Sequence, residues 1–326
     1  MKVAVYHNNN DIRIEERAVP EINAGEILVK VRASGICGTD IMEWYRIKKA
    51  PRILGHEITG DIVQSRSDKY TTGQRVFVSH HVPCNSCKYC DDGNHTACET
   101  LHNGNYEPGG FSEYIRVPEI NVRYGVYVLP DNVSYEEGTL IEPLACAVRA
   151  QRITAVKGNQ IVLVMGAGFS GLLNIQVAKY KKAKVIVIDI DSYRMNKARE
   201  FGADEVIYAD DVLKVKPDRI IICTGAMQAF EQAFRYIDRK GIILFFSIPN
   251  KDVPIPVVDF WRNEISIVSS YGAGPDDLEE SMELISNGKI NVKELITHNL
   301  KLEDIQQGFK LAEKGGETIK VIIHPD

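Results

Sequence analysis

The 326-residue chain has no excess of basic residues: 39 lysines and arginines stand against 44 aspartates and glutamates, and the formal net charge is −5. Proteins that hold nucleic acid through its phosphates carry basic stripes or patches. The one basic cluster here, residues 179–184, is short and fits the solvated end of a helix. We therefore expect no nucleic-acid partner.

A long uninterrupted apolar run is also missing. The most apolar stretch, residues 161–178, is broken by glycines and polar side chains, whereas a membrane span needs about 20 consecutive apolar residues. The first residues, MKVAVYHNNND, lack the basic and apolar regions of a secretory signal. We expect no membrane partner and a cytoplasmic location.

Internal repeats and low-complexity tracts are absent, and the composition is that of a folded protein. Hydrophobic residues make up 44% and charged residues 25%, which excludes disorder as the dominant state. The length fits two domains on the usual expectation of about 100–200 residues each.

Two patterns of hydrophobicity divide the chain. Up to Leu129 apolar and polar residues alternate, which predicts short strands at residues 3–6, 12–15, 27–33, 57–63 and 74–78. Ser134 and Glu137 then fit a capping box that opens a helix. From residue 161 onward, apolar strands alternate with helices, which predicts a doubly wound α/β domain with a parallel sheet.

The elements expected in that second domain are strands at residues 161–165, 184–189, 205–208, 219–223, 241–247 and 265–269, with helices at 172–181, 192–201 and 228–237. Ten residues join the strands at 205–208 and 219–223, too few for a complete crossover helix, so we expect a loop or a single helical turn there.

The C-terminal part predicts helices at residues 276–287 and 302–312 and a last strand at 318–323. That strand has no evident partner in the parallel sheet. We therefore expect the chain to return to the β-rich domain. The expected domains are 1–143 with 272–326, and an inserted nucleotide-binding domain at 144–271.

Seven cysteines are an odd number, and four of them cluster in one short segment. Cys84, Cys87, Cys90 and Cys98 supply four thiolates, the set that a structural zinc ion prefers in a closed tetrahedron. The alternative is a disulfide pair or free thiols. Cys146 and Cys223 are interpreted as small apolar residues.

A second set of possible metal ligands consists of Cys37, His56 and Glu57. A thiolate, an imidazole and a carboxylate make up the three protein ligands of an open zinc site, whose vacant position takes water or a substrate oxygen. Glu142, before Pro143, could add another carboxylate. Its alternative role is that of an acidic residue favoured by the dipole at a helix N-terminus.

A glycine-rich motif, Gly166-Ala167-Gly168-Phe169-Ser170-Gly171, follows a predicted apolar strand and opens a predicted helix. In this context Gly166 makes the tight turn, Gly168 lets the backbone approach a pyrophosphate, and Gly171 lets helix and strand pack closely. The helix N-terminus holds the phosphates.

Asp189 ends the next strand, 18 residues after Gly171. A carboxylate there accepts hydrogen bonds from the ribose hydroxyls and repels a 2′-phosphate, which favours NAD over NADP. Arg194 nearby is the one opposing signal, and we expect it along the adenosine edge or in solvent.

Taken in order, these motifs resemble those of the zinc-dependent medium-chain dehydrogenase/reductase family, and within it most closely the sorbitol (L-iditol 2-) dehydrogenase branch. The segments that carry the resemblance are residues 35–40, 54–57, 81–84, 110–114, 142–144 and 295–298. The resemblance spans nearly the whole chain and is specific for fold and reaction class, but much less so for substrate.

The resemblance implies a GroES-like catalytic domain, a Rossmann domain, an active site in the cleft between them, and one catalytic and one structural zinc per subunit. Cys37, His56 and Glu57, or Glu142 in exchange with water, would hold the catalytic ion. Zinc would act as a Lewis acid on the alcohol oxygen, with hydride passing to NAD.

A proton relay is implied as well, with Thr39 as its first acceptor. Met42 stands where many relatives have a histidine at the solvent end of the relay. His81 is a candidate substitute, and a plain structural histidine is the alternative. Trp44 lies where relatives shape the substrate pocket, and simple packing is its alternative role.

These residues predict an NAD-dependent oxidoreductase that acts on a secondary hydroxyl of a polyol or sugar-like alcohol. A threonine-type or simple alcohol dehydrogenase of the same family is the nearer alternative, and a non-catalytic nucleotide-binding protein is the remote one. The resemblance also implies a homotetramer or homodimer, paired near residues 265–269.

Overall fold

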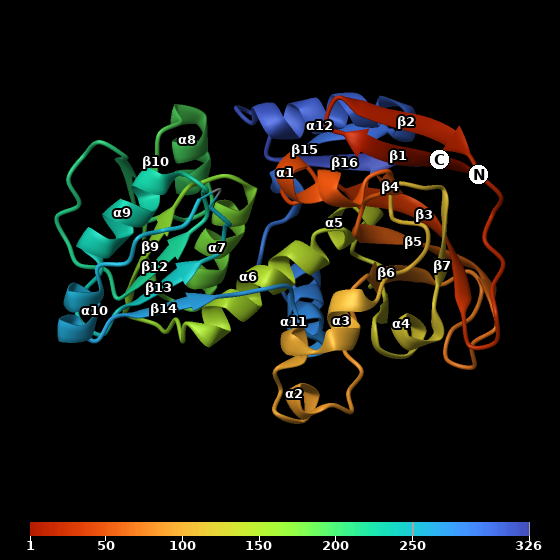
Figure 1. Cartoon of the computed structure of the whole chain (residues 1–326), viewed down its shortest axis with the longest axis horizontal. Helices are drawn as coiled ribbons and strands as arrows, with labels where there is room; N and C mark the ends of the chain where they lie inside the picture. Colours follow the sequence, from red (N-terminus) through yellow and green to blue (C-terminus); the bar gives the residue numbers. More distant parts are fainter. Residues whose placement is uncertain (250, 326) are drawn as a thin grey trace. The chain divides into compact units, whose positions relative to one another are not determined.

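The computed structural model describes residues 1–249 and 251–325, and these form two compact units. Unit 1 consists of Met1–Ala145 and Gly272–Asp326, and unit 2 of Cys146–Tyr271. The chain thus leaves unit 1 and returns to it, and both chain ends lie in that unit (Figure 1). Among the described residues no helix combines the length and apolarity that crossing a membrane requires.

Unit 1 is built on a seven-stranded sheet in the order β15-β16-β3-β5-β6-β8, with β7 paired to β3. These strands are β3 (Ile27–Gly35), β5 (Glu57–Ser65), β6 (Arg75–Ser79), β7 (Tyr114–Val117), β8 (Val126–Val128), β15 (Ile296–Lys301) and β16 (Lys320–His324). The last strand, β16, pairs antiparallel with β3, which confirms that the chain returns to the β-rich part.

A smaller three-stranded sheet completes the β-structure of unit 1. It contains β1 (Lys2–Asn8), β2 (Asp11–Glu16) and β4 (Arg52–Ile53). Four consecutive residues of β1, 3–6, are buried in an apolar core in which the ring of Phe309 packs against Tyr6 and Phe111. Phe309 lies on α12 (Ile305–Lys314), so the C-terminal helix helps hold the first strand in place.

Short helices connect or flank the strands of unit 1. They are α1 (Glu43–Arg46), α2 (Lys88–Asp91), α3 (Glu99–Asn103), α4 (Glu119–Tyr124), α5 (Tyr135–Gly138) and the longer α11 (Pro275–Ser286). The predicted capping box is confirmed at α5, because Ser134 and Glu137 bond reciprocally to each other's backbone. Helix α6 (Ile141–Ile153) begins in unit 1 and continues into unit 2.

Unit 2 contains a six-stranded parallel sheet in the order β11-β10-β9-β12-β13-β14. Its strands are β9 (Ile161–Met165), β10 (Lys184–Asp189), β11 (Glu205–Tyr208), β12 (Arg219–Ile222), β13 (Ile242–Phe245) and β14 (Ser266–Ser269). The strand order reverses direction between β9 and β12, which is where ligands bind in doubly wound folds.

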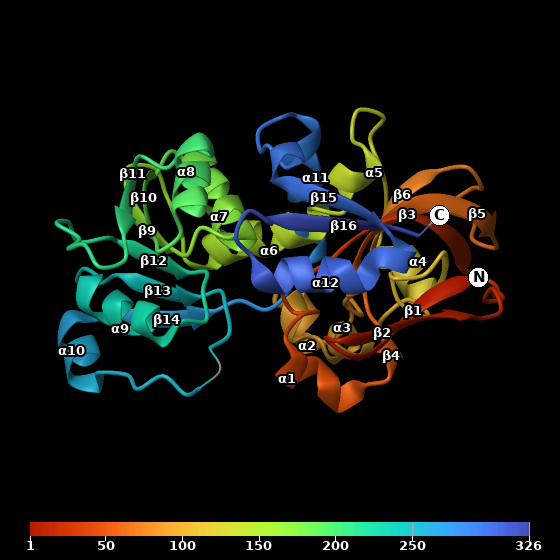
Figure 2. The ribbon, with the colours of Figure 1, turned by 90° about the horizontal axis from the view of Figure 1, so that it is seen from above.

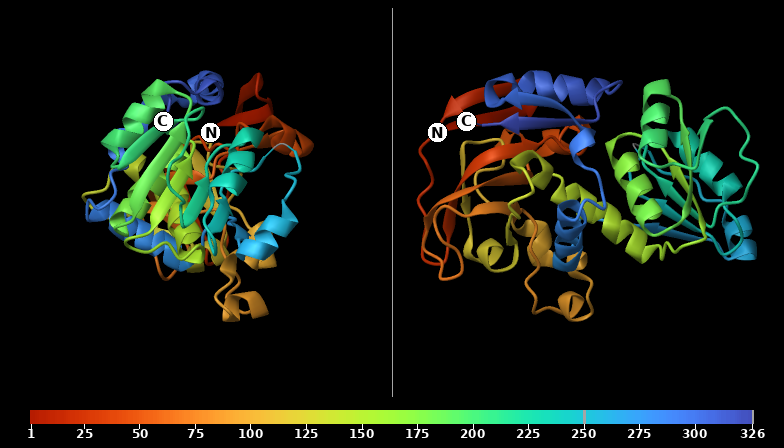
Figure 3. Two further views of the ribbon diagram at one scale, coloured as in Figure 1. Left: turned by 90° about the vertical axis from the view of Figure 1, so that its left-hand side faces the viewer. Right: turned by 180° about the vertical axis from the view of Figure 1, so that it is seen from behind.

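Helices cover both faces of this sheet (Figure 3). Helices α7 (Phe169–Tyr180) and α8 (Ser192–Glu200) connect strands on one side of the switch point, and α9 (Met227–Tyr236) and α10 (Val257–Asn263) on the other. Right-handed crossovers in opposite directions put the two pairs on opposite faces. The ten residues after β11 contain no helix, as predicted, and form the loop visible beside β11 in Figure 2.

Candidate active site

Cys37 lies in a tight turn that directly follows β3. The backbone of this turn is closed by Asp40, whose N–H donates to Cys37 O at 2.9 Å and whose Oδ2 accepts from Cys37 N at 3.1 Å. Thr39 donates to Cys37 Sγ twice, from its backbone N at 3.5 Å and from Oγ1 at 3.4 Å. Both donors point at the sulfur and fix its position in the turn.

His56 and Glu57 occupy the end of the loop that enters β5. Gly55 before them has φ +90°, and a side chain there would meet the backbone of Phe111 at 2.7 Å, so the position requires glycine. One ligand atom from each of Cys37, His56 and Glu57 lies within 4.8 Å of the others. The structure therefore brings together the three residues that the sequence predicted as metal ligands.

The surroundings of this cluster are negatively charged and fit a cation. Burial opposes a charge on His56, but Asp40 and Cys37 raise the pKa of His56 well above its usual value. Burial works against ionised Asp40, yet His56 and Arg46 lower the pKa of this carboxyl. Glu57 is fully buried, and its Oε1 has no hydrogen-bond partner. An orphaned carboxylate oxygen beside a thiol and an imidazole fits the three-ligand zinc set.

Arg46 is a residue of this site that the sequence reasoning missed. Its Nε donates to Thr39 O at 2.9 Å, and Nη2 donates to Thr39 Oγ1 at 2.9 Å and lies 3.3 Å from Asp40 Oδ1. The single turn of α1 brings the Arg46 side chain back to Thr39. No motif or residue spacing in the sequence predicts this contact. A guanidinium cannot take up a proton, so Arg46 aligns the Thr39 hydroxyl without serving as its acceptor.

His81 packs beside a second histidine that the sequence reasoning did not single out. The ring centroids of His80 and His81 lie 3.6 Å apart, and those of His80 and His56 lie 4.9 Å apart. Burial and the neighbouring His56 lower the pKa of His81 to about 3. The group that reaches the Thr39 hydroxyl is Arg46, so a relay role for His81 stays a prediction.

Glu142 lies in the first turn of α6 and is 9% exposed. It is not a member of the Cys37, His56 and Glu57 group. Burial, together with the charges of Asp40, Glu142 and Glu57, raises the pKa of Tyr106 well above its usual value. Both roles weighed for Glu142, ligand and helix N-terminal carboxylate, therefore remain compatible with its position.

Trp44, which lies where relatives shape the substrate pocket, is on α1. Trp44 is 47% exposed and contacts the ring of Tyr45 edge-on, so packing in the core does not account for it. Glu43 accepts a hydrogen bond from Asn9 N at 2.9 Å, which ties α1 to the turn after β1. Met42 is the N-cap residue of α1.

Cys84, Cys87, Cys90 and Cys98 form a separate group around α2. Their sulfurs lie within 4.8 Å of one another, with neighbouring distances of 3.5, 3.6 and 3.9 Å. Four sulfurs at about 2.3 Å from one zinc in a tetrahedron would lie about 3.8 Å apart. None of the seven cysteines, all of which lie in the described part of the chain, forms a disulfide, and the spacing within the cluster fits a structural zinc.

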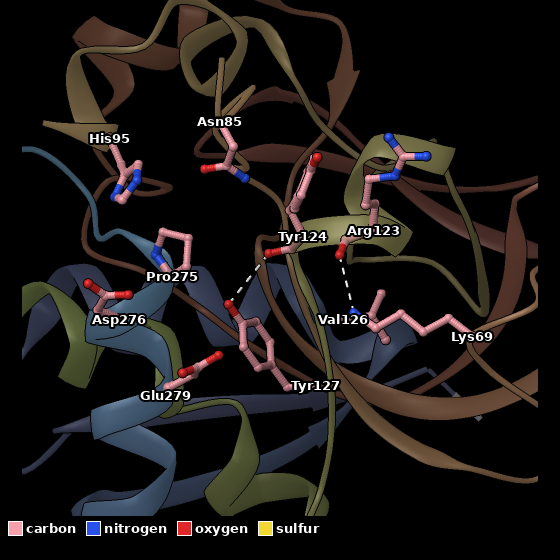
Figure 4. A pocket seen from close by; sticks show the side chains of 10 residues that line it. All are labelled: Lys69, Asn85, His95, Arg123, Tyr124, Val126, Tyr127, Pro275, Asp276 and Glu279. Atoms are coloured by element: carbon pink, nitrogen blue, oxygen red, sulfur yellow. Dashed lines mark hydrogen bonds between the residues drawn. The ribbon is translucent and has the colours of Figure 1, made fainter. Parts of the chain in front are cut away.

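Two thiols of this lobe have pKa values shifted in opposite directions. Hydrogen bonds from Ser86 lower the pKa of Cys84 to about 6, whereas burial raises the pKa of Cys90 to about 12. Turns at Asn85 and Gly93, with φ of 53° and 72°, let the chain wrap around the sulfurs. A cavity of about 360 Å³ lies between this lobe and α11 (Figure 4).

Basic and acidic side chains both line that cavity, and none of the predicted site residues does. The lining residues are Lys69, Asn85, His95, Arg123, Tyr124, Val126, Tyr127, Pro275, Asp276 and Glu279.

In unit 2 the glycine-rich loop takes the geometry that the motif predicts. Gly166 has φ +95°, and a side chain there would crowd the backbone of Cys223 at 3.1 Å. A methyl group on Gly171 would overlap Gly166 O, so α7 packs directly on the turn. Around Gly168 there is nothing within 4 Å of an added Cβ. Phe169 and Ser170 form the first turn of the helix, whose N–H groups suit a phosphate.

Asp189 is buried at the end of β10 and is tied to the glycine loop. Its Oδ2 accepts from Ala167 N at 2.5 Å, and its Oδ1 accepts from Ile190 N and Asp191 N at 2.7 and 2.9 Å. These backbone donors fix the carboxylate and hold the loop against β10. Arg194 is partly buried, with its Nε shielded from solvent and without a hydrogen-bond partner.

The sequence matches two family models. The model described as "Alcohol dehydrogenase GroES-like domain" matches residues 23–130, and the model described as "Zinc-binding dehydrogenase" matches residues 171–287. Sorbitol dehydrogenase of Bacillus subtilis (strain 168) is 30% identical over 350 residues, covering 100% of this chain and 98% of that protein.

Solved structures agree with this likeness. The 2R,3R-butanediol dehydrogenase from Bacillus subtilis superposes with a TM-score of 0.87 at 28% identity, covering 100% of this chain and 99% of that one. An alcohol dehydrogenase from Escherichia coli CFT073, solved with NADH, gives a TM-score of 0.89 at 29% identity with the same coverage.

Proposed function

Because the chain belongs to the zinc-dependent medium-chain dehydrogenase/reductase family, we propose that it transfers a hydride from a secondary hydroxyl of a polyol or sugar-like alcohol to NAD. The observation that carries this proposal is the convergence of Cys37, His56 and Glu57 within 4.8 Å. A non-catalytic protein on this fold would have no need to retain that donor set.

Cys37, His56 and Glu57 would hold the catalytic zinc. Glu142 is the candidate carboxylate that would replace Glu57 as a ligand, in exchange with water. A zinc ion there supplies Lewis-acid polarisation of an alcohol oxygen. The four cysteines of the α2 lobe would hold the structural zinc.

In this proposal Thr39 receives the proton of the substrate hydroxyl, and Arg46 orients the Thr39 hydroxyl. The Thr39 hydroxyl donates to Cys37 Sγ and accepts from Arg46, which leaves Oγ1 one lone pair to accept the hydrogen bond of a substrate hydroxyl. When that proton moves to Oγ1, the hydroxyl would release its own proton toward solvent, so that Thr39 stays neutral. The guanidinium holds the hydroxyl in a single orientation, and its positive charge favours departure of the proton toward solvent. His81 remains the candidate for the solvent end of this path.

Asp189 would select NAD in the nucleotide site. Its carboxylate is held by three backbone amides and ends β10 beside the glycine loop, where a ribose hydroxyl is recognised in this fold. NAD, when bound, accepts the hydride. Gly166, Gly168, Phe169, Ser170 and Gly171 would cradle the pyrophosphate, with Arg194 along the adenosine edge.

The substrate class rests on the relatives. Sorbitol dehydrogenase supports a polyol, and 2R,3R-butanediol dehydrogenase supports the alternative of a simpler alcohol. NADH formation with sorbitol, xylitol, galactitol, inositols, threonine, 2,3-butanediol and short secondary alcohols, with zinc added, separates these classes. Activity on none of them, with NAD and zinc bound, would contradict the proposal.

Domain roles, assembly and location complete the proposal. Residues 1–143 with 272–326 would form the catalytic domain and 144–271 the NAD-binding domain. Val257, Val258 and Trp261 on α10 are 69%, 72% and 79% exposed near the sheet's last strand, which supports a homodimer or homotetramer. Light scattering tests the mass, and cell fractionation tests the cytoplasmic location.

A further inference from the structure

A buried ion pair connects the C-terminal strand to the proposed metal site. Lys320 Nζ donates to Glu57 Oε2 and, at 3.0 Å, to Ile36 O. The side chains of Lys320 and Glu57 are 1% and 0% exposed. Burying an ammonium group lowers the stability of the fold unless the group is paired and hydrogen-bonded. A lysine buried beside a proposed metal ligand is therefore a candidate for a functional role.

The strand register explains how two residues 263 positions apart meet. Glu57 on β5 lies opposite Gly35 on β3, and Gly35 lies opposite Ile322 on β16. Lys320 precedes Ile322 by two residues and therefore shares its face of the sheet. A methyl group on Gly35 would overlap Glu57 Oε2 and lie 3.0 Å from Lys320 Cε. The missing side chain at Gly35 opens the space in which the pair forms.

The pair leaves the two oxygens of Glu57 in different situations. Oε2 is held by Lys320, whereas Oε1 is buried and has no hydrogen-bond partner. Resting on the proposed function, we infer that Lys320 is a positioning residue: by holding Oε2 it directs Oε1 of Glu57 to the catalytic zinc as the resting carboxylate ligand, ahead of Glu142.

The charge of Lys320 has a second consequence. A thiolate and a carboxylate together neutralise a divalent ion, which would weaken the attraction of the site for an electron-rich substrate oxygen. The ammonium on the far oxygen offsets the charge of Glu57, so the ion together with its two charged ligands and Lys320 keeps a net positive charge. Partners of ligands typically alter metal affinity by about 10- to 100-fold when they are removed.

Zinc affinity of the full-length holoenzyme, measured by competition with a chelator, tests this inference without relying on activity. Lys320→Met keeps the length of the side chain and removes its charge, and we expect about 10- to 100-fold weaker binding at one of two zinc sites. Cobalt substituted at that site should show altered visible absorption. Lys301→Met, an exposed lysine on the neighbouring strand β15, is the control and should bind zinc normally.

A double-variant cycle shows whether Lys320 acts through Glu57. In a Glu57→Gln background, Lys320→Met should cause no further loss, because its partner is gone. Equal loss in both backgrounds, or unchanged affinity and an unchanged cobalt spectrum in Lys320→Met, would overturn the inference. Gly35→Ala perturbs the pair from the other side and should weaken the same site.

Folding is monitored by thermal unfolding and by retention of the structural zinc. If Lys320→Met does not fold, Gly35→Ala and the double variant, which removes both charges, still decide the question. Failure of the proposed function is distinguishable from failure of this inference. In that case the wild-type enzyme forms no NADH from any alcohol, although Lys320→Met still weakens its zinc binding.

Discussion

The two cysteine-containing clusters of unit 1 differ in how they are assembled. The α2 lobe takes four identical ligands from one segment of 15 residues. The other cluster takes three different ligands from the turn after β3 and the start of β5. Lys320 on β16 contacts its Glu57, and Arg46 on α1 contacts Thr39 and Asp40 in the turn that carries Cys37. A symmetric local set suits an ion that stabilises a loop, whereas an asymmetric, charge-compensated set suits an ion that binds substrate.

The largest expected effect comes from breaking the asymmetric cluster. Cys37→Ser removes its thiolate, and we expect kcat/KM for the alcohol to fall by about 10³-fold or more, because the Lewis acid is lost. Zinc analysis should show a fall from two ions per subunit to one. Cys146→Ser, the same change outside both clusters, should retain both ions. Full activity of Cys37→Ser with one zinc would contradict the catalytic assignment.

Loss of the proton acceptor should have a smaller effect. Thr39→Val keeps the shape of the side chain and removes the hydroxyl that Arg46 orients. We expect kcat to fall by about 10²-fold, within the range for general acid–base groups, while zinc content stays at two. Thr39→Ser should recover most of the activity. A Thr39→Val enzyme with wild-type kcat would remove Thr39 from the proton path.

A substitution in the nucleotide site, outside both metal clusters, provides an activity loss with which the effects of the cluster variants can be compared. Asp189→Asn retains an acceptor for the backbone amides but loses the charge, and we expect kcat/KM for NAD to fall by about 10- to 100-fold. The preference for NAD over NADP should shrink, with little change in kcat at saturating cofactor. Asp204→Asn, beside the same sheet, is the control. An unchanged cofactor preference would contradict the role of Asp189.

The smallest effect on activity is expected from the symmetric cluster. Cys90→Ser removes one of its four sulfurs, and it should lower the thermal unfolding midpoint and increase proteolysis within the lobe, because that segment has a small apolar core of its own. Turnover per correctly folded enzyme should stay within a few-fold of wild type. A loss as large as that of Cys37→Ser would show that the clusters are not functionally separate.

Strands and helices of unit 2 could be predicted because buried parallel strands have continuous apolar runs. All six strands and the helices α7, α8 and α9 lie where the periodicity placed them, within a few residues. In unit 1 the periodicity missed short elements, among them β4, β7, β8 and the helices α1 to α4. Segments of two to six residues carry too little periodic signal, and their pairing is decided by the strands beside them.

Close spacing within one segment is enough to identify the four-cysteine lobe and the glycine loop from the sequence, because ligands and turns that are near in sequence are near in space. The remaining contacts of the site depend on the strand order and register of the seven-stranded sheet. Only the pairing of β16 with β3, and of β3 with β5, brings Lys320 to Glu57 across Gly35. Only the turn of α1 brings Arg46 to Thr39. Such contacts depend on strand order and side-chain packing, which no local pattern in the chain encodes.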